Sequence, residues 1–259
     1  MGTVGFVVVS YNDLDLSQKM YKSLVDTLSE CKYCKYGYAL TVVDAGSTDG
    51  SVQFWEGIAP VISKHNPELC NLLDVKPEDL MHLSVCLNAG TKHLLMNDKV
   101  DKVMWIHPDC TFVNTTWCSE LVDFIDNNPW TGKAASDDVN QIKQTRFPAN
   151  QQPHMISRKC IEDMIEKDGY LYDTRFLQIG GFEDLDLARR QLLMGYVPVI
   201  VGNSVLEHPS MLSRQRHDTT KYGFYNAGMM YNKWTLKNIG DFAEGIEDFW
   251  SKLDWRYER

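Results

Sequence analysis

Polar residues end an apolar run within the segment KVMWIHPDCTF, residues 102–112. Four apolar residues, 103–106, are followed at once by His107 and Asp109, with one proline between them. An imidazole and a carboxylate so placed at the end of a buried strand have two explanations. The first is a tight turn. The second is a metal ion, because imidazole nitrogen and carboxylate oxygen are both metal ligands. The residues alone leave both open.

Two other predicted strands end on side chains that could bind a ligand. Tyr11 follows the apolar run at 4–10, where its ring could contact a ligand or simply pack. Asp44 ends the run ALTVVD at 39–44. Its carboxylate could accept a hydrogen bond from a ligand, or it could cap a turn.

Strand-like and helix-like segments alternate along the first half of the chain. Apolar runs of strand length alternate with amphipathic stretches of helical period, at residues 4–10, 17–29, 39–46, 79–96 and 102–106. This alternation predicts a parallel sheet covered by helices on both faces. Ligands of such sheets bind beyond the carboxyl ends of the strands, which is where Tyr11, Asp44 and Asp109 are expected.

The second half of the chain has a weaker pattern. Residues 136–153 are polar and contain prolines, which predicts a long loop near the site. A strand and a helix are expected over 154–169, and a helix from about 184 to 195 leads into a further strand. Aromatic residues at roughly helical spacing over 220–257 predict a helical tail.

Five segments of the chain are notable for their order and spacing: VVVSYND, VVDAGSTDGS, LNAG, WIHPDC and GGFEDLDLARRQLLMGY. Together they resemble the family 2 glycosyltransferases with the GT-A fold, across roughly residues 4–208. The later His208 and the segment TKYGFYNAGMMYNKW are similar to the tails of the rhamnosyltransferase-like branch. The resemblance implies an α/β, GT-A (nucleotide-diphospho-sugar transferase) fold. Its central sheet would be mostly parallel and flanked by helices, with a helical C-terminal tail.

The same resemblance implies how the chain is divided. One GT-A domain is expected over residues 1–208, with a donor half at about 1–112 and an acceptor half at about 113–208. Residues 209–259 are expected to form a loop and a helical extension packed on that domain. The residues of the donor half that match donor-binding positions of the family are Ser10, Tyr11, Asp44, Asn88 and His107. The resemblance implies that the Tyr11 ring lies against the nucleobase and that Asp44 accepts a hydrogen bond from the base imide.

The metal motif of that family is Asp-x-Asp after a buried strand, and the matching segment here is HPD. Asp109 falls on the position that holds the metal, and His107 replaces the first carboxylate. His208 matches a histidine that supplies a further ligand. The resemblance therefore implies a divalent cation, Mn²⁺ or Mg²⁺, that offsets the charge of a diphosphate leaving group. An imidazole ligand favours Mn²⁺.

The segment GFEDLDLARR matches the acceptor-side motif of the family. Asp184 falls on the position of the general base, and Glu183 is implied to support it or to bind the acceptor. The alternative is that both carboxylates only offset the helix dipole in a first turn. Arg214 and Arg216 follow in a polar loop, where they either bind diphosphate oxygens or form a solvated charge cluster.

Composition and charge restrict the class of protein. The chain has 259 residues, of which 44% are hydrophobic, enough for one sizeable core. No run of 18 apolar residues predicts a transmembrane helix. A net charge of −9 argues against a general nucleic-acid-binding protein. Seven cysteines, an odd number, suit a reduced protein of the cytoplasm, or of the host cytoplasm if the chain is viral.

The cysteine spacing CKYC, residues 31–34, would suit half of a zinc site. A second pair is missing, because the other cysteines are scattered singly along the chain: Cys70, Cys86, Cys110, Cys118 and Cys160. Packed or helix-end thiols are therefore favoured over zinc.

The resemblance to family 2 glycosyltransferases implies an inverting, metal-dependent glycosyltransferase that moves a hexose or a pentose from a nucleotide-diphosphate donor to an acceptor hydroxyl. A phage- or virus-type transferase for hydroxymethylated DNA bases is one alternative, which the acidic charge disfavours. A non-catalytic nucleotide-sugar or glycan-binding protein of the same fold is another. His107 favours it, but Glu183 and Asp184 argue against it, because binding a donor needs no acceptor base. The acceptor stays open: a glycan, a protein side chain or a modified base.

Overall fold

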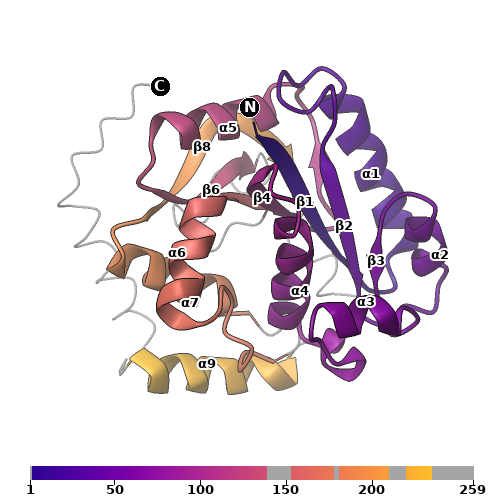
Figure 1. Cartoon of the computed structure of the whole chain (residues 1–259), viewed down its shortest axis with the longest axis vertical. Helices are drawn as coiled ribbons and strands as arrows, with labels where there is room; N and C mark the ends of the chain where they lie inside the picture. The colour runs from indigo at the N-terminus through magenta and orange to yellow at the C-terminus, as the bar shows by residue number, and fades with distance from the viewer. Residues whose placement is uncertain (1, 139–152, 178–180, 210–219, 235–259) are drawn as a thin grey trace.

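The computed structural model describes residues 2–138, 153–177, 181–209 and 220–234. These residues form one eight-stranded sheet in the order β3-β2-β1-β4-β7-β6-β8-β5 (Figure 1). The strands are β1 (Thr3–Ser10), β2 (Ala39–Asp44), β3 (Val61–Ile62), β4 (Val100–Ile106), β5 (Thr111–Phe112), β6 (Thr131–Asp138), β7 (His154–Ser157) and β8 (Val197–Glu207). The helices are α1 (Leu14–Leu28), α2 (Ser51–Glu56), α3 (Pro67–Leu72), the 3₁₀ helix η1 (Pro77–Met81), α4 (Leu83–Leu95), α5 (Trp117–Asn127), α6 (Arg158–Asp168), α7 (Glu183–Leu193) and α9 (Thr220–Trp234).

The first half of the sheet is parallel, as its alternating strands and helices predicted. Strand β1 pairs in parallel with β2 and with β4, and β2 pairs in parallel with β3. The register sets Ser10 beside Asp44 and Val8 beside Ile106. The carboxyl ends of β1, β2 and β4 are therefore neighbours at one edge of the sheet, as expected for parallel strands.

The second half of the sheet is mixed. Strand β7 is antiparallel to both β4 and β6, β6 is parallel to β8, and β5 is antiparallel to β8. Because β7 reverses the direction and β6 reverses it again, β6 and β8 run the same way as β4. Their carboxyl ends lie at the same edge as those of β1 and β2. Four of the seven pairings are parallel.

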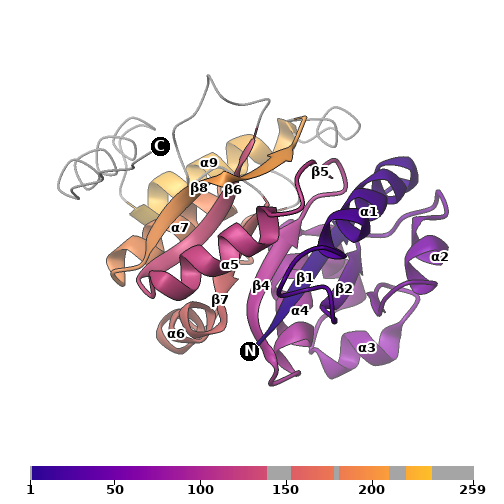
Figure 2. The same ribbon diagram turned by 90° about the horizontal axis from the view of Figure 1, so that it is seen from above.

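The core has one layer on each face of the sheet, because alternate residues of a strand point to opposite faces. On one face, Phe6 and Val8 of β1 pack with the apolar sides of α1, α2 and α5. On the other face, Val7 packs with α4, α6 and α7. Figure 2 shows these helices on the two sides of the sheet. Such a two-sided cover explains why β1 and β4 read as nearly continuous apolar runs.

Three sequence expectations need correction or completion. The helix expected over 79–96 is two elements, because His82 is extended between η1 and α4. The loop expected over 136–153 begins later, since 136–138 belong to β6, and 139–152 lie outside the described residues. The tail is helical over 220–234, and the rest of it is outside the description. No described helix is both long enough and apolar enough to cross a membrane.

Candidate functional site

Two histidines and an aspartate from distant parts of the chain meet beyond the carboxyl end of β4. After Ile106 the chain turns, and the Cys110 amide donates to the carbonyl of His107 at 3.1 Å. Strand β5 then pairs with the end of β8, with Thr111 beside Glu207. His208, the residue after β8, is thereby placed next to the turn.

The ligand atoms of His107, Asp109 and His208 all lie within 4.8 Å of one another. His208 Nε2 is 3.2 Å from Asp109 Oδ1, and the two imidazole rings are 5.5 Å apart between centroids. The Asp109 residue is only 5% exposed, so its carboxylate is largely withdrawn from water. Two imidazoles and one carboxylate form a donor set that suits Mn²⁺ and other first-row divalent metals. The residues therefore fit a divalent cation, and His107 joins the two predicted ligands.

The loops after β1 and β2 are tied to each other. The Thr48 amide donates to Asn12 Oδ1 at 2.7 Å, and the Asn12 amide donates to Ser47 Oγ at 2.9 Å. Asp49 accepts from the amides of Leu14 and Ser51, each at 3.0 Å. These bonds fix the two loops to each other at the carboxyl edge of the sheet, and Asp49 shapes its own loop through them.

Asp44 acts as a turn cap. Its Oδ1 accepts from the amides of Gly46 and Ser47 at 2.9 Å, and its Oδ2 accepts from Ser47 Oγ at 2.5 Å. The carboxylate is fully buried. A carboxylate offers about four lone-pair sites, and three of them are used within this turn. A contact between Asp44 and a base remains a prediction.

Three other residues that were predicted to bind the donor can be described by their hydrogen bonds or exposure. Ser10 Oγ donates to Asp13 Oδ1 at 2.8 Å, at the start of α1. The side chain of Asn88, on α4, binds both backbone groups of Tyr172. It accepts a hydrogen bond from the Tyr172 amide at 2.9 Å and donates one to the Tyr172 carbonyl at 2.8 Å. Tyr11 is partly exposed at the end of β1. Arg214 and Arg216 lie outside the described residues.

Two acidic residues begin α7 after a strained turn. Glu183 and Asp184 are the first two residues of the helix, and Glu183 is buried. Gly181 and Phe182 both have left-handed backbones, with φ of 79° and 78°. Such a conformation costs a bulky residue about 1–3 kcal/mol, so the surrounding packing must hold it. The turn presents both carboxylates at the N-terminus of α7.

A fully buried lysine lies next to one of these acidic residues. Lys133, on β6, has its Nζ 4.0 Å from Asp184 Oδ2. Burial lowers the pKa of Lys133 to about 8, and the charges of Asp184 and Glu183 oppose that effect. The sequence analysis missed this residue, because strand β6, TGKAASDD, has no apolar run to reveal it. A lysine between glycine and two alanines was the only signal.

The burial of Lys133 predicts a distinct dependence of stability on pH. Its folded pKa, about 8, lies below the ordinary value of 10.5, so between these pH values the unfolded chain binds more protons. Stability contributed by this group therefore rises as pH increases from 8 to 10.5. Urea unfolding of the wild type and of Lys133→Met at pH 7 and pH 10 should show the wild type gaining up to about 3 kcal/mol relative to the variant.

Lys102→Met is the matched control for that measurement. Lys102 is also buried, which alone would lower its pKa, but hydrogen bonds to Asp126 and Asp101 outweigh burial and raise it. A raised lysine pKa gives stability that persists up to 10.5, so the difference between wild type and Lys102→Met should change little over the same range. An equal change for both lysine variants would contradict the prediction.

Helix α9 is attached to α7 through buried charges. Asp186 accepts from Arg190 Nε at 2.9 Å, lies 2.8 Å from Lys233 Nζ, and accepts from the Trp234 indole at 2.9 Å. Lys233 also donates to Asp173 at 2.7 Å. Lys233 and Trp234 of α9 therefore pair with buried acids of the rest of the described chain.

Comparisons with known proteins agree on the fold. No protein-family model matches the sequence, and no curated protein matches it. Among solved structures, glucosyl-3-phosphoglycerate synthase from Mycobacterium tuberculosis, in complex with Mg²⁺ and uridine diphosphate, is similar with a TM-score of 0.60 and 14% identity. The similarity covers 92% of this chain and 81% of that one.

Two further structures are similar over shorter shares of their length. A mannosyltransferase from Pyrobaculum calidifontis, in complex with GDP-Man and Mn²⁺, has a TM-score of 0.57 and 17% identity over 80% of this chain. TarS from S. aureus has a TM-score of 0.56 and 13% identity over 83% of this chain. The chain spans only 56% and 38% of these two proteins. The expected α/β, GT-A fold of nucleotide-sugar transferases is confirmed.

Proposed function

We propose that this protein is a metal-dependent, inverting glycosyltransferase of family 2, in its rhamnosyltransferase-like branch. Its donor is a nucleoside-diphosphate sugar, and its acceptor carries a hydroxyl group. One observation carries the proposal: on a GT-A fold, His107, Asp109 and His208 gather beyond the carboxyl end of β4. Ligands of such sheets bind at this edge. A cation site there suits a substrate that carries a diphosphate.

The donor occupies the edge formed by β1, β2 and β4 in this proposal. Tyr11 supports the base with its ring, and Asp44 accepts from the base imide with its remaining lone pair. Ser10 and Asn88 hold the loops that surround the donor, and Arg214 and Arg216 contact its diphosphate. Asp109, His208 and His107 hold Mn²⁺ or Mg²⁺, which supplies positive charge against the diphosphate as it leaves.

The acceptor reacts at the start of α7 in this proposal. Its hydroxyl oxygen attacks the anomeric carbon from the face opposite the leaving group, and the bond from that carbon to the diphosphate oxygen breaks. The Asp184 carboxylate takes the hydroxyl proton, and the nucleoside diphosphate leaves with the bonding electrons. Glu183 orients the acceptor, and the nearby Lys133 ammonium offsets the charge of the two carboxylates.

The proposal includes the division of the chain. Residues 1–208 are the catalytic domain, with a donor half at about 1–112 and an acceptor half at about 113–208. Residues 209–259 extend it. The sugar is a hexose or a pentose, and the reaction takes place in the cytoplasm. Among the described residues, nothing favours a DNA base over a glycan or a protein side chain as the acceptor.

A ligand panel tests the proposal. Thermal unfolding is measured with UDP-, GDP-, dTDP- and CMP-sugars, each with and without Mn²⁺. At a donor concentration about 100 times Kd, the matching donor should raise Tm by about 5–10 °C. Most of that rise should require Mn²⁺, because the diphosphate binds through the cation.

The controls of the panel are two histidine variants. His208→Ala should lose the part of the rise that needs Mn²⁺. His93→Gln, in the last turn of α4 and bonded to Thr41 Oγ1, should keep it. If no nucleotide sugar changes Tm in the presence of Mn²⁺, the proposed donor site is wrong.

A further inference from the structure

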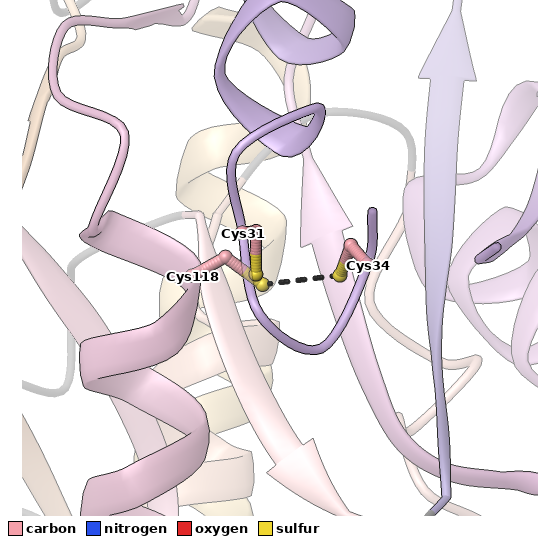
Figure 3. Close-up of side chains that lie close together, drawn as sticks. All are labelled: Cys31, Cys34 and Cys118. Carbon is pink, nitrogen blue, oxygen red and sulfur yellow. Dashed lines mark hydrogen bonds between the residues drawn. The ribbon is translucent and has the colours of Figure 1, made fainter. Parts of the chain in front are cut away.

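Three cysteines from two distant segments meet on the face of the sheet covered by α1 and α5 (Figure 3). Cys31 and Cys34 lie in the turn that follows α1, and Cys118 is the second residue of α5. Cys34 Sγ is 3.5 Å from Cys118 Sγ, and the three sulfur atoms all lie within 4.8 Å of one another. None of the three residues is more than 2% exposed.

The backbone of the turn directs both of its thiols toward α5. The amides of Cys34 and Lys35 donate to the Cys31 carbonyl at 3.1 and 2.9 Å, so the two cysteines are separated by one tight turn. Two side chains within that turn, Lys32 and Tyr33, donate to Asp123 of α5. The three thiols are therefore held together by contacts that do not involve sulfur.

Tight links between α1 and α5 support the same arrangement. The Trp117 indole, one residue before Cys118, donates to Thr27 Oγ1 at 2.9 Å. Trp117 and Thr27 are both buried, and Thr27 lies in the last turn of α1. The start of α5 is thereby fixed against the end of α1, which brings Cys118 to the CKYC turn.

We propose that Cys31, Cys34 and Cys118 bind a zinc ion that stabilises the fold. A Zn–S bond is about 2.3 Å, so sulfur atoms around a tetrahedral zinc ion lie about 3.8 Å apart. The three thiols are close to that spacing with only small shifts. Ser119 Oγ, 3.4 Å from Cys31 Sγ, is an oxygen atom next to the fourth position.

Zinc binds the thiolate form of cysteine, so loading the site would release protons from the thiols. Thiolate sulfur is a soft ligand that suits zinc.

Three other cysteines of this chain are packed thiols, and their hydrogen bonds differ from those of the cluster. Cys70 donates to the Ser63 carbonyl and Cys86 to the Leu80 carbonyl, while Cys160 accepts from Gln191. Each satisfies its thiol through one neighbour of another type. The thiol that completes the CKYC pair is Cys118, which is 84 residues beyond Cys34 and therefore could not be found from local spacing.

The proposed zinc site is separate from the candidate site at the carboxyl edge. Helix α1 begins after the carboxyl end of β1 and runs back for 15 residues, about 22 Å, before the CKYC turn. The zinc would join the α1–β2 connection to α5, and so link the two halves of the chain. Its role is structural, and it does not depend on the proposed transferase activity.

Metal analysis of the full chain tests the zinc site. The protein is purified under reducing conditions with Asp109→Ala in place, so that metal at the candidate site does not contribute. About one zinc per chain should remain after dialysis. Replacement by Co²⁺ should give the thiolate-to-metal charge-transfer absorption that only cysteine ligands produce. Removing the metal with a chelator should lower Tm by at least about 5 °C.

Two serine variants in the same background separate the cluster from other thiols. Cys118→Ser should lose the zinc and the Co²⁺ absorption, and Cys70→Ser should keep both. If Cys118→Ser does not fold, the Co²⁺ spectrum of the parent protein still shows whether cysteine thiolates bind the metal. Absence of that absorption, retention of Cu⁺ in place of zinc, or a disulfide among the three cysteines in the purified reduced protein would each overturn the proposal.

Discussion

Asp184→Asn is expected to reduce sugar transfer by at least about a hundredfold while leaving donor affinity nearly unchanged. The asparagine keeps the size of the side chain, and its amide oxygen can still accept from the Leu185 amide, as Asp184 Oδ1 does at 2.9 Å. It cannot take a proton from the acceptor. The measurement is the transfer rate at saturating donor, together with donor Kd from the thermal-shift titration.

Glu183→Gln is the comparison variant for that experiment. It should reduce transfer less, or weaken acceptor binding more than it lowers the maximal rate. Normal transfer by Asp184→Asn together with a strong loss in Glu183→Gln would identify Glu183, and not Asp184, as the base. If neither variant affects transfer, the base is another residue. If the wild type binds a donor but transfers its sugar to no acceptor, a binding protein of the same fold becomes the better explanation.

The stereochemistry of the product is an independent readout for the same residue. An acceptor activated by Asp184 on the face opposite the diphosphate gives a product of inverted anomeric configuration. Proton NMR of the anomeric signal, followed from the start of the reaction, distinguishes inversion from retention. A retained configuration would rule out the direct attack that gives Asp184 its role.

Asp109→Ala is expected to abolish detectable turnover, with a loss of about a thousandfold or more. Its carboxylate is the one anionic ligand in a group whose other members are the imidazoles of His107 and His208. Without it, the divalent cation binds weakly, and the diphosphate leaves without several kcal/mol of charge stabilisation. Initial rates are measured over a range of Mn²⁺ concentrations.

His208→Ala should raise the Mn²⁺ concentration needed for half-maximal rate, and excess Mn²⁺ should restore part of the activity. His93→Gln should leave the Mn²⁺ dependence as in the wild type. Full activity of the wild type in excess EDTA would contradict a metal mechanism. In that case, cationic side chains such as Arg214 would have to stabilise the leaving diphosphate.

Strand ends were predictable from the sequence because β1, β2 and β4 are buried on both faces and therefore read as apolar runs. A parallel arrangement then required their ends to share one edge. This is why Asp44 and Asp109 could be placed at the same edge without coordinates. The pairing of β5 with β8 was not predictable, since two-residue strands carry no period, and the resemblance alone supplied His208.

Polar strands and long-range side-chain contacts escaped the sequence analysis. Strand β6 contains a buried lysine whose charge is offset by acids 50 residues away, and nothing local signals that compensation. The hydrogen bonds of Asn88 to the backbone of Tyr172 are likewise set by tertiary packing. Residue type and position identified candidates for the site, but the contacts that orient them depend on segments far apart in the chain.

Helix α9 bears on how this chain can be divided. Strand β8 is the last strand of the described chain, so its end looks like a natural place for a shortened version to finish. Removing everything beyond it would take away Lys233, whose ammonium lies between two buried carboxylates, Asp173 and Asp186. Those acids would then share fewer cations in a dry interior, a costly change. The smallest autonomous unit therefore extends at least through Trp234, and α9 belongs to the scaffold and is not a detachable appendage.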